Sequence, residues 1–395
     1  MLANVSLNTY VQAMRIAIDA RMMGAENTRG IGRYIEEIIR ALLLIAPEHR
    51  YVVIARRLDH AFALHPSVHT IVGDIPWYGP AEQFKMPAVL RSARADVIHV
   101  PHWNVPLATR GPLVVTIHDL LLRHEPASAK SSTRDPVTRA MKRLGYRVTL
   151  AHATNAARTI LVPTQCVAKD IARFYPRTAK KIIVTGEGMP ELAAGNWHLG
   201  TEKSDTQFPA TSYQLPATFF LYVGSAYPHK GLTDLLDAWE NIVAAHSEFS
   251  LLIVGEMDVF MRRVQSAAEL KKLSRIVFLG RVSENELADL YARATAFIFP
   301  SHIEGFGLSP LEAISAGCPV VCADIPALRE VLGDDGAIFF RAGDPDDILR
   351  AVTELLRTLP ERRNQVHTLA ARLRERWSWT QVAQRTLTAY LGAAS

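Results

Sequence analysis

Residues 301–312 have the sequence Ser-His-Ile-Glu-Gly-Phe-Gly-Leu-Ser-Pro-Leu-Glu, and the rest of the chain can be interpreted outward from them. The preceding residues 296–300, Ala-Phe-Ile-Phe-Pro, are apolar and end in proline, which predicts a short buried strand. The apolar residues of 311–316 have helical spacing, and Gly317 follows them as a helix end. The stretch therefore predicts a strand, a loop with two glycines and the start of a helix.

This arrangement is suited to binding phosphate. Glycines let the backbone approach a ligand closely, and the first turn of a helix offers free N–H groups and the positive end of its dipole. Two carboxylates, Glu304 and Glu312, flank the loop. We interpret the strand, the glycine loop, the helix start and the two acids as a sugar-nucleotide site.

A purely structural interpretation is open as well. Residues 309–312, Ser-Pro-Leu-Glu, have the pattern of a capping box, in which Ser309 caps the helix and Glu312 folds back onto the capping amide. Glu304 would then be an ordinary surface acid. Short motifs produce many false positives, so the rest of the chain has to decide.

Length and composition indicate a large globular protein. A chain of 395 residues with 49% hydrophobic and 21% charged residues predicts roughly two or three domains with sizeable cores. The net charge of +5 permits attraction to anionic lipid or to nucleotide phosphates. The basic residues are scattered without the aromatic interleaving of RNA-binding segments, so we expect no nucleic-acid partner.

Targeting signals and cysteines favour a cytoplasmic protein. The sequence contains no run of about 18 apolar residues, so we expect no transmembrane helix. Residues 1–13 lack the pattern of a secretory signal and are interpreted as an appended tail. The three cysteines, Cys166, Cys318 and Cys322, have no histidine at zinc-ligand spacing, and we expect thiols in a reducing compartment.

Short apolar segments alternate with helical ones through the first half, which predicts a parallel sheet with helices on both faces. Ligands of such sheets bind beyond the carboxyl ends of the strands, where His118 and Asp119 are expected. The predicted strands are 15–19, 51–55, 96–100, 113–117, 160–164 and 182–184.

Two further segments of this half allow alternatives. A loop with Gly24, Gly30 and Gly32 joins the first strand to a helix; it lacks the third glycine of a dinucleotide-binding loop, and its glycines permit a turn or contact a substrate. The basic helix predicted over 135–158 is either a solvated face or a patch that lies on anionic membrane.

Residues 190–215 lack periodicity and are predicted to be a linker at a domain boundary. A second alternating series follows, with a helix over 232–245 and a last amphipathic helix over 377–391. Its predicted strands are 219–223, 250–254, 276–279, 296–300, 319–323 and 336–340.

The chain resembles the retaining GT-B glycosyltransferases of the family 4 type, in particular bacterial mannosyl- and rhamnosyltransferases of surface polysaccharides. The resemblance spans the chain from Ile16 to the last helix, and its most specific element is the E-x7-E pattern of Glu304 and Glu312. It is supported by Gly30 and Gly32, by His118-Asp119, by Lys230 in its Pro-His-Lys-Gly turn, and by the strand-end glycines Gly224, Gly255 and Gly280.

This resemblance implies an α/β, GT-B fold of two Rossmann-like, doubly wound parallel-sheet domains that face each other across a cleft. Residues 14–200, with a crossover helix over 377–395, would bind the acceptor. Residues 216–376 would bind the nucleotide sugar.

The resemblance also implies roles for single residues. Lys230 would neutralise the donor diphosphate, Glu312 would hold ribose hydroxyls, and Glu304 would lie at the transferred sugar. His118 would reach that sugar from the opposite domain. Further donor contacts are expected from Gly30, Gly32, Gly224, Ser225, Gly255, Arg281, Gly305, Phe306, Gly307 and Leu308, with the amides of 306–309 forming a phosphate cradle.

One departure concerns the phosphate contacts. Ser225 stands where similar proteins often carry an arginine, so neutralisation of the donor phosphates would depend more on Lys230. Arg281 either helps to neutralise these phosphates or is simply an exposed side chain. We expect no cofactor and no required metal. The Asp344-Pro345-Asp346 sequence, the one D-x-D match, is interpreted as a helix cap.

The predicted reaction is transfer of a hexosyl unit from a nucleotide sugar to a hydroxyl with retention, by attack on the face from which the nucleotide departs. GDP-mannose is the favoured donor, with UDP- or dTDP-sugars as alternatives. The expected acceptor is a lipid-linked saccharide, with the enzyme peripheral on an anionic inner membrane face. A sugar-nucleotide epimerase and a non-catalytic sugar or nucleotide binder are the rival functions.

Overall fold

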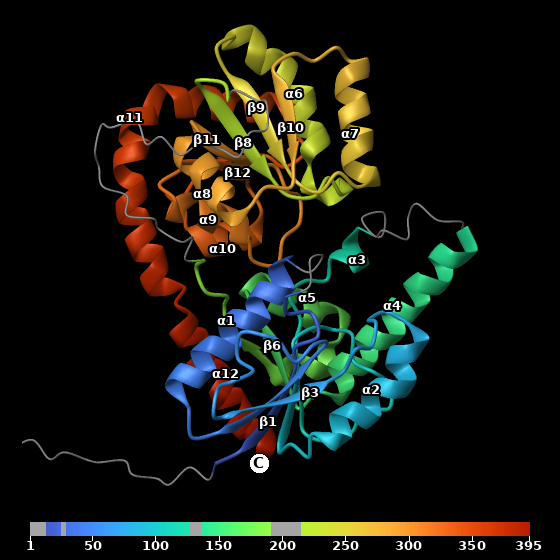
Figure 1. Cartoon of the computed structure of the whole chain (residues 1–395). Coiled ribbons are helices and arrows are strands. Elements are labelled where there is room, and N and C mark those ends of the chain that lie inside the picture. Colours follow the sequence, from blue (N-terminus) through green and yellow to red (C-terminus); the bar gives the residue numbers. More distant parts are fainter. Residues whose placement is uncertain (1–12, 25–28, 126–135, 191–214) are drawn as a thin grey trace, which may run out of the picture.

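The computed structural model describes residues 13–24, 29–125, 136–190 and 215–395, and it contains two separate parallel sheets (Figure 1). One sheet forms the lower half of the molecule in Figure 1 and the other the upper half. The predicted α/β fold with two parallel sheets is confirmed. Most of the predicted linker, 191–214, and the tail, 1–12, lie outside the described residues.

The N-terminal sheet has the strand order β3-β2-β1-β4-β5-β6-β7, and every neighbouring pair is parallel. Its two faces are covered by apolar side chains of the helices, which form two core clusters. The strands are β1 (Arg15–Asp19), β2 (Arg50–Ala55), β3 (Val68–Val72), β4 (Val97–Val100), β5 (Leu113–Thr116), β6 (Thr159–Val162) and β7 (Ile182–Val184). The helices are α1 (Arg29–Ile45), α2 (Pro80–Ser92), α3 (Leu121–His124), α4 (Pro136–Ala156), α5 (Gln165–Phe174) and the 3-10 helix η3 (Pro176–Lys181).

The C-terminal sheet has the order β10-β9-β8-β11-β12-β13, again wholly parallel, and encloses one large core. Its strands are β8 (Phe219–Val223), β9 (Ser250–Val254), β10 (Ile276–Gly280), β11 (Ala296–Phe299), β12 (Val320–Ala323) and β13 (Ile338–Phe340). Its helices are η4 (Pro228–Lys230), α6 (Leu232–Ala245), α7 (Val259–Leu270), α8 (Glu284–Arg293), α9 (Leu308–Ser315), α10 (Pro326–Leu332) and α11 (Pro345–Arg376).

The end of the chain returns to the first half. The long helix α11 runs down one side of the molecule, and α12 (Trp379–Ala394) packs against α1 beside the N-terminal sheet (Figure 1). The hydroxyl of Tyr390 lies 2.7 Å from Nδ1 of His99, whose Nε2 lies 2.8 Å from the Thr116 hydroxyl. Buried polar contacts therefore fix α12 to strands β4 and β5.

Two helix starts and the three thiols bear on individual predictions. Gly30 and Gly32 were predicted in a loop, but they lie in the first turn of α1, because the helix already begins at Arg29. The capping role of Asp344 is confirmed, since its side chain accepts from the Asp347 amide at the start of α11. All three thiols are free. Within the described residues, no helix combines the length and apolar character needed to span a bilayer.

Candidate functional site

The two halves meet where the strands of both sheets end. The loop after β11 carries Gly305, whose carbonyl accepts from the Thr164 hydroxyl at 2.9 Å across the boundary. A Cβ atom on Gly305 would lie 1.9 Å from the carbonyl oxygen of His118, at the end of β5. Because only glycine allows this approach, the loop after β11 lies directly against the predicted His118-Asp119 segment.

Lys230 and Glu304 form an ion pair at this boundary. Lys230 Nζ lies 2.6 Å from Glu304 Oε1, and both side chains are largely buried. The turn that carries Lys230 ends at Gly231, which has a φ of 63° and would place a Cβ atom 2.0 Å from the Pro300 carbonyl. The glycine thus holds the lysine turn tightly against the loop of Glu304.

The start of helix α9 differs from the capping-box alternative. Gly307, with a φ of 93°, occupies the N-cap, so the helix begins at Leu308 and Ser309 lies inside it. Glu312 does not fold back: its Oε1 accepts from Arg33 Nη1 at 2.9 Å, and its Oε2 accepts from the Tyr291 hydroxyl at 3.3 Å. Burial raises the pKa of Glu312, and the charge of Arg33 opposes this shift.

The amides of this first turn are available to a ligand. Within the described residues, the N–H groups of Gly307, Leu308 and Ser309 donate to no backbone carbonyl outside the helix, and no side chain caps them. Such groups at a helix start, together with the helix dipole, form a favourable position for an anion. This position fits the predicted phosphate cradle. Phe306, also predicted there, has its ring buried 5.1 Å from that of Trp377.

His118 is held by two hydrogen bonds from the N-terminal side. Its Nδ1 lies 2.7 Å from Glu187 Oε1 and its Nε2 lies 3.2 Å from the Pro101 carbonyl. Burial disfavours the charged ring, but the hydrogen bond and charge of Glu187 outweigh it and raise the pKa of His118. An acceptor at each nitrogen matches the hydrogen-bonding pattern of the protonated ring, which can donate from both nitrogens. Asp119, beside it, accepts from the Leu121 amide at 2.9 Å.

The remaining predicted residues have structural partners. A Cβ atom on Gly255 would lie 2.1 Å from the Gly224 carbonyl, so Gly255 permits the strand ends of β8 and β9 to pack. The carbonyl of Ser225 accepts from the Tyr222 hydroxyl at 2.6 Å. Arg281 lies 3.1 Å from Glu256, and both side chains are well exposed. These contacts leave their donor roles as predictions.

Two site residues were missed, Arg33 and Glu187. Glu187 follows strand β7 directly, and its position at a strand end was a usable signal for a ligand-side acid. Arg33 had no such signal, because its contact with Glu312 joins residues 279 positions apart. In the described part of the chain, no cluster of three His, Cys, Asp or Glu side chains could hold a metal ion.

Two family models match the chain. The one described as "Glycosyltransferase Family 4" matches residues 28–189, and "Glycosyl transferases group 1" matches residues 204–371. "O-antigen chain mannosyltransferase B" of Escherichia coli is 28% identical over 309 residues, 76% of this chain and 75% of that protein. "O-antigen chain mannosyltransferase RfbU" of Salmonella typhimurium is 26% identical over 272 residues, 69% and 67% of the two chains. The "Glycogen synthase" of Mycobacterium tuberculosis is 27% identical over 311 residues, 77% and 70%.

Solved structures share the fold. "Sucrose-phosphate synthase" from Thermosynechococcus elongatus superposes with a TM-score of 0.72 at 20% identity, over 96% of this chain and 99% of that one. "WaaG, a glycosyltransferase involved in lipopolysaccharide biosynthesis" superposes with a TM-score of 0.69 at 15% identity, over 94% and 98%. At these identities, the likeness establishes the fold alone.

Proposed function

The chain is a GT-B glycosyltransferase of the family 4 type, and on this premise we propose that it transfers a mannosyl unit from GDP-mannose to a lipid-linked saccharide with retention. The observation that carries the site is the Lys230–Glu304 pair beside the free amides that begin α9. The choice of mannose is supported by the names of the O-antigen relatives. The glycogen synthase relative keeps a glucosyl donor as the alternative.

The diphosphate of the donor would bind between Lys230 and the first turn of α9. The cation and the amides would stabilise the charge that develops on the departing phosphate, so these residues need no metal to bind it. The phosphate would replace Glu304 as the ion-pair partner of Lys230, and the Glu304 carboxylate would then face the sugar. Likewise, ribose hydroxyls would compete with Arg33 for Glu312.

The transfer step follows from the groups present. The bond from the sugar C1 to the phosphate oxygen breaks, and a bond from C1 to the acceptor hydroxyl forms on the same face. The acceptor proton passes to the departing phosphate oxygen. To donate to a sugar hydroxyl, the His118 ring would exchange its 3.2 Å contact with the Pro101 carbonyl for that hydroxyl, while Glu187 keeps the other ring nitrogen.

A panel of radiolabelled nucleotide sugars with bacterial membrane extract tests the proposal. We expect label from GDP-mannose to enter the lipid fraction, and the product to keep the anomeric configuration of the donor. Transfer from a UDP- or dTDP-sugar alone would replace the donor. Acceptor-independent conversion would indicate an epimerase, and tight binding without product would indicate a binder.

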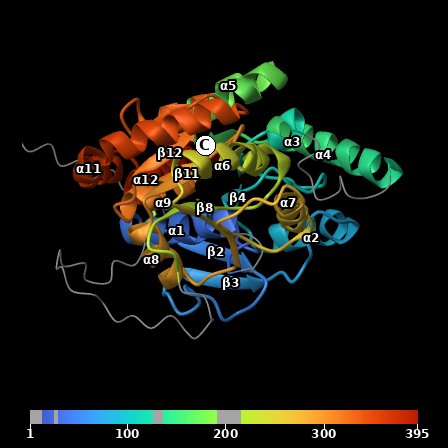
Figure 2. The same ribbon diagram turned by 90° about the horizontal axis from the view of Figure 1, so that it is seen from above.

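We also propose that the enzyme binds an anionic membrane surface, and helix α4 supports this. Figures 1 and 2 show that this helix projects from the N-terminal half. Four large apolar side chains lie on one side of it, within roughly 60° around the axis, and they are exposed: Val137 69%, Met141 69%, Leu144 64% and Val148 45%. The other sides carry Arg139, Lys142, Arg143 and Arg147. An apolar stripe flanked by cations is complementary to an anionic lipid surface.

Vesicles of phosphatidylglycerol and phosphatidylcholine test this surface. The Met141→Glu/Leu144→Glu variant is expected to bind them roughly tenfold more weakly, because it replaces two inserted side chains with charges that the lipid repels. Leu270→Glu is the control, since Leu270 is also exposed but lies on α7 of the other half. Equal sedimentation of all three proteins with vesicles would show that α4 is only a solvated face.

A further inference from the structure

A group of aromatic side chains lies beside His118 and takes no part in the donor site. Tyr78 precedes helix α2, and His102 and Trp103 follow strand β4; we call these three residues the aromatic platform. The carbonyl of Pro101, which directly precedes His102, lies 3.2 Å from Nε2 of His118. The platform is therefore adjacent to the reaction centre, on the half expected to bind the acceptor.

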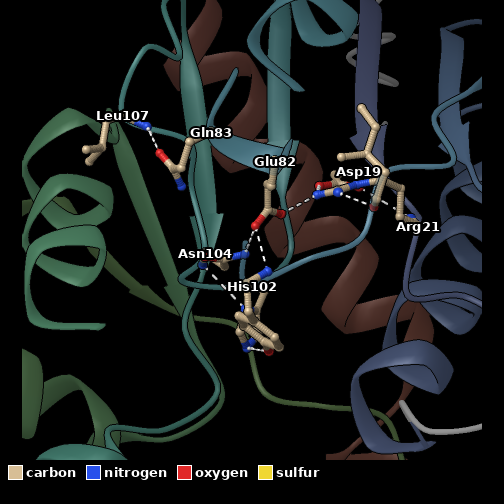
Figure 3. Close-up of polar contacts among 9 residues, drawn as sticks. Asp19, Arg21, Glu82, Gln83, His102, Asn104 and Leu107 are labelled. Carbon is tan, nitrogen blue, oxygen red and sulfur yellow. Dashed lines mark hydrogen bonds and ion pairs between the residues drawn. The ribbon is translucent and has the colours of Figure 1, made fainter. Parts of the chain in front are cut away.

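The platform is supported by a buried ionic network, shown in Figure 3. The guanidinium of Arg21 donates to both carboxylate oxygens of Asp19, at 2.8 Å each, and to Glu82 Oε1 at 2.7 Å. The other oxygen of Glu82 accepts from the amide of Tyr78 at 2.9 Å and from the side chain of Asn104. One carboxylate thus ties together the two loops that carry the platform.

This network is support and not itself a sugar site. The cavity that its residues line has a volume of about 10 Å³, which is room for about one water molecule. The Arg21, Asp19 and Glu82 side chains are almost completely buried. A saccharide could contact only the layer in front of them, which is the platform.

Tyr78 has a strained backbone. Its φ is 64°, a left-handed conformation that is unfavourable for a bulky residue, although a glycine follows at position 79. Strain of this kind persists where surrounding contacts enforce it, and it concentrates at ligand sites. The hydrogen bond from the Tyr78 amide to Glu82 holds this conformation in place. The chain therefore carries an aromatic ring at a position where glycine would have less backbone strain.

The hydrogen bonds at the platform leave the Tyr78 hydroxyl proton unused. The amide of Asn104 donates to His102 Nδ1 at 3.3 Å, so the proton of this ring lies on Nε2. That Nε2 lies 3.3 Å from the Tyr78 hydroxyl and donates to its oxygen. Burial lowers the pKa of His102 to about 3, and nearby His118 adds to the shift, so the ring stays neutral. The phenol can therefore donate to a ligand oxygen.

The rings are arranged as a layered surface. Tyr78 is 53% exposed and stacks on Trp103, with ring centroids 5.5 Å apart and an angle of 29° between the planes. Trp103 in turn packs edge-on against the buried Tyr146, at 4.8 Å. A pyranose has the complementary chemistry: one face of C–H groups packs on an aromatic ring, and its hydroxyls accept hydrogen bonds.

We propose that the aromatic platform is the subsite for a pyranose ring of the acceptor, with Tyr78 stacking on the sugar and donating a hydrogen bond to it. This rests on the proposed function in so far as the acceptor is a saccharide, but it does not depend on which donor is used. It makes Tyr78 a specificity-determining residue for the acceptor.

Saturation-transfer NMR with the full chain tests the subsite without turnover. The probes are the methyl α-glycosides of mannose, rhamnose, glucose, galactose and N-acetylglucosamine. We expect at least one to bind the wild type, and its Kd to rise roughly threefold to tenfold in Tyr78→Gly. Tyr78→Phe keeps the ring and should lose less. Phe84→Ala removes an exposed ring on α2 outside the platform and should leave binding unchanged.

Thermal unfolding separates this role from a structural one. Glycine relieves the backbone strain, so Tyr78→Gly should unfold at or above the wild-type Tm while it loses sugar binding. Unchanged binding in Tyr78→Gly, or no binding of any probe to the wild type, would overturn the subsite even if GDP-mannose is the donor. Sugar binding that is lost in Tyr78→Gly would support it even if the mannosyl donor proved wrong.

Discussion

Replacing Lys230 with methionine is expected to lower kcat about 10²- to 10³-fold. The methionine keeps much of the apolar stem but removes the positive charge that lies 2.6 Å from Glu304 and faces the proposed diphosphate position. Loss of one preorganised group that stabilises transition-state charge typically costs about 3–4 kcal/mol. The effect should be large here because Ser225 supplies no second cation beside it. Initial rates of sugar transfer at saturating donor measure it.

Stability has to be separated from catalysis in this test. Lys230→Met leaves the largely buried Glu304 without its partner, which is destabilising. The double variant Lys230→Met/Glu304→Gln removes the unpaired charge, and we expect it to recover Tm but not activity. Lys271→Met is the matched control, since Lys271 also pairs with a carboxylate, Asp237, but both side chains are well exposed and the pair should contribute little. Transfer by Lys230→Met within about threefold of wild type would remove the lysine from the mechanism.

The sheets could be predicted because their strands are buried on both faces and appear in the sequence as apolar runs. Strand β3 (Val68–Val72) was missed since it lies at the sheet edge, is only partly buried and includes polar residues. Helix α11 was not predicted at its full length of 32 residues, and Pro360 lies inside it. Edge exposure and a tolerated proline thus explain the main gaps in the predicted fold.

The candidate site was predicted unevenly. Short-range pattern and resemblance together placed His118 at a strand end, Lys230 in a turn and Glu304 in a glycine loop, and the structure brings the three to one boundary. The capping box failed because the helix start is fixed by tertiary packing: a Cβ atom on Gly307 would lie 2.5 Å from Leu328. Contacts that cross between the halves, such as Arg33 with Glu312, have no local signature.

The second large effect is expected from Gly305→Ala, which should lower the transfer rate about 10²-fold or more. The new methyl group would lie 1.9 Å from the His118 carbonyl and 3.4 Å from Asp119 Cβ. Backbone at that distance cannot yield locally, so the loop after β11 and the end of β5 must separate. A displacement of about 1 Å between groups that act on one substrate can cost 10²-fold in rate. Initial rates with the donor identified by the panel measure the loss.

We expect Gly305→Ala to fold normally, so that its effect is limited to the contact between the two halves. Each sheet keeps its own core, and Gly305 lies at the boundary between them. We therefore expect a Tm near that of wild type and a larger radius of gyration in small-angle scattering. Gly145→Ala is the control: its Cβ atom meets open space on α4, and alanine there should stabilise the helix by about 0.5–1 kcal/mol. Wild-type turnover by Gly305→Ala would contradict this prediction. It would show that transfer does not require the close contact between the Gly305 loop and the His118 backbone.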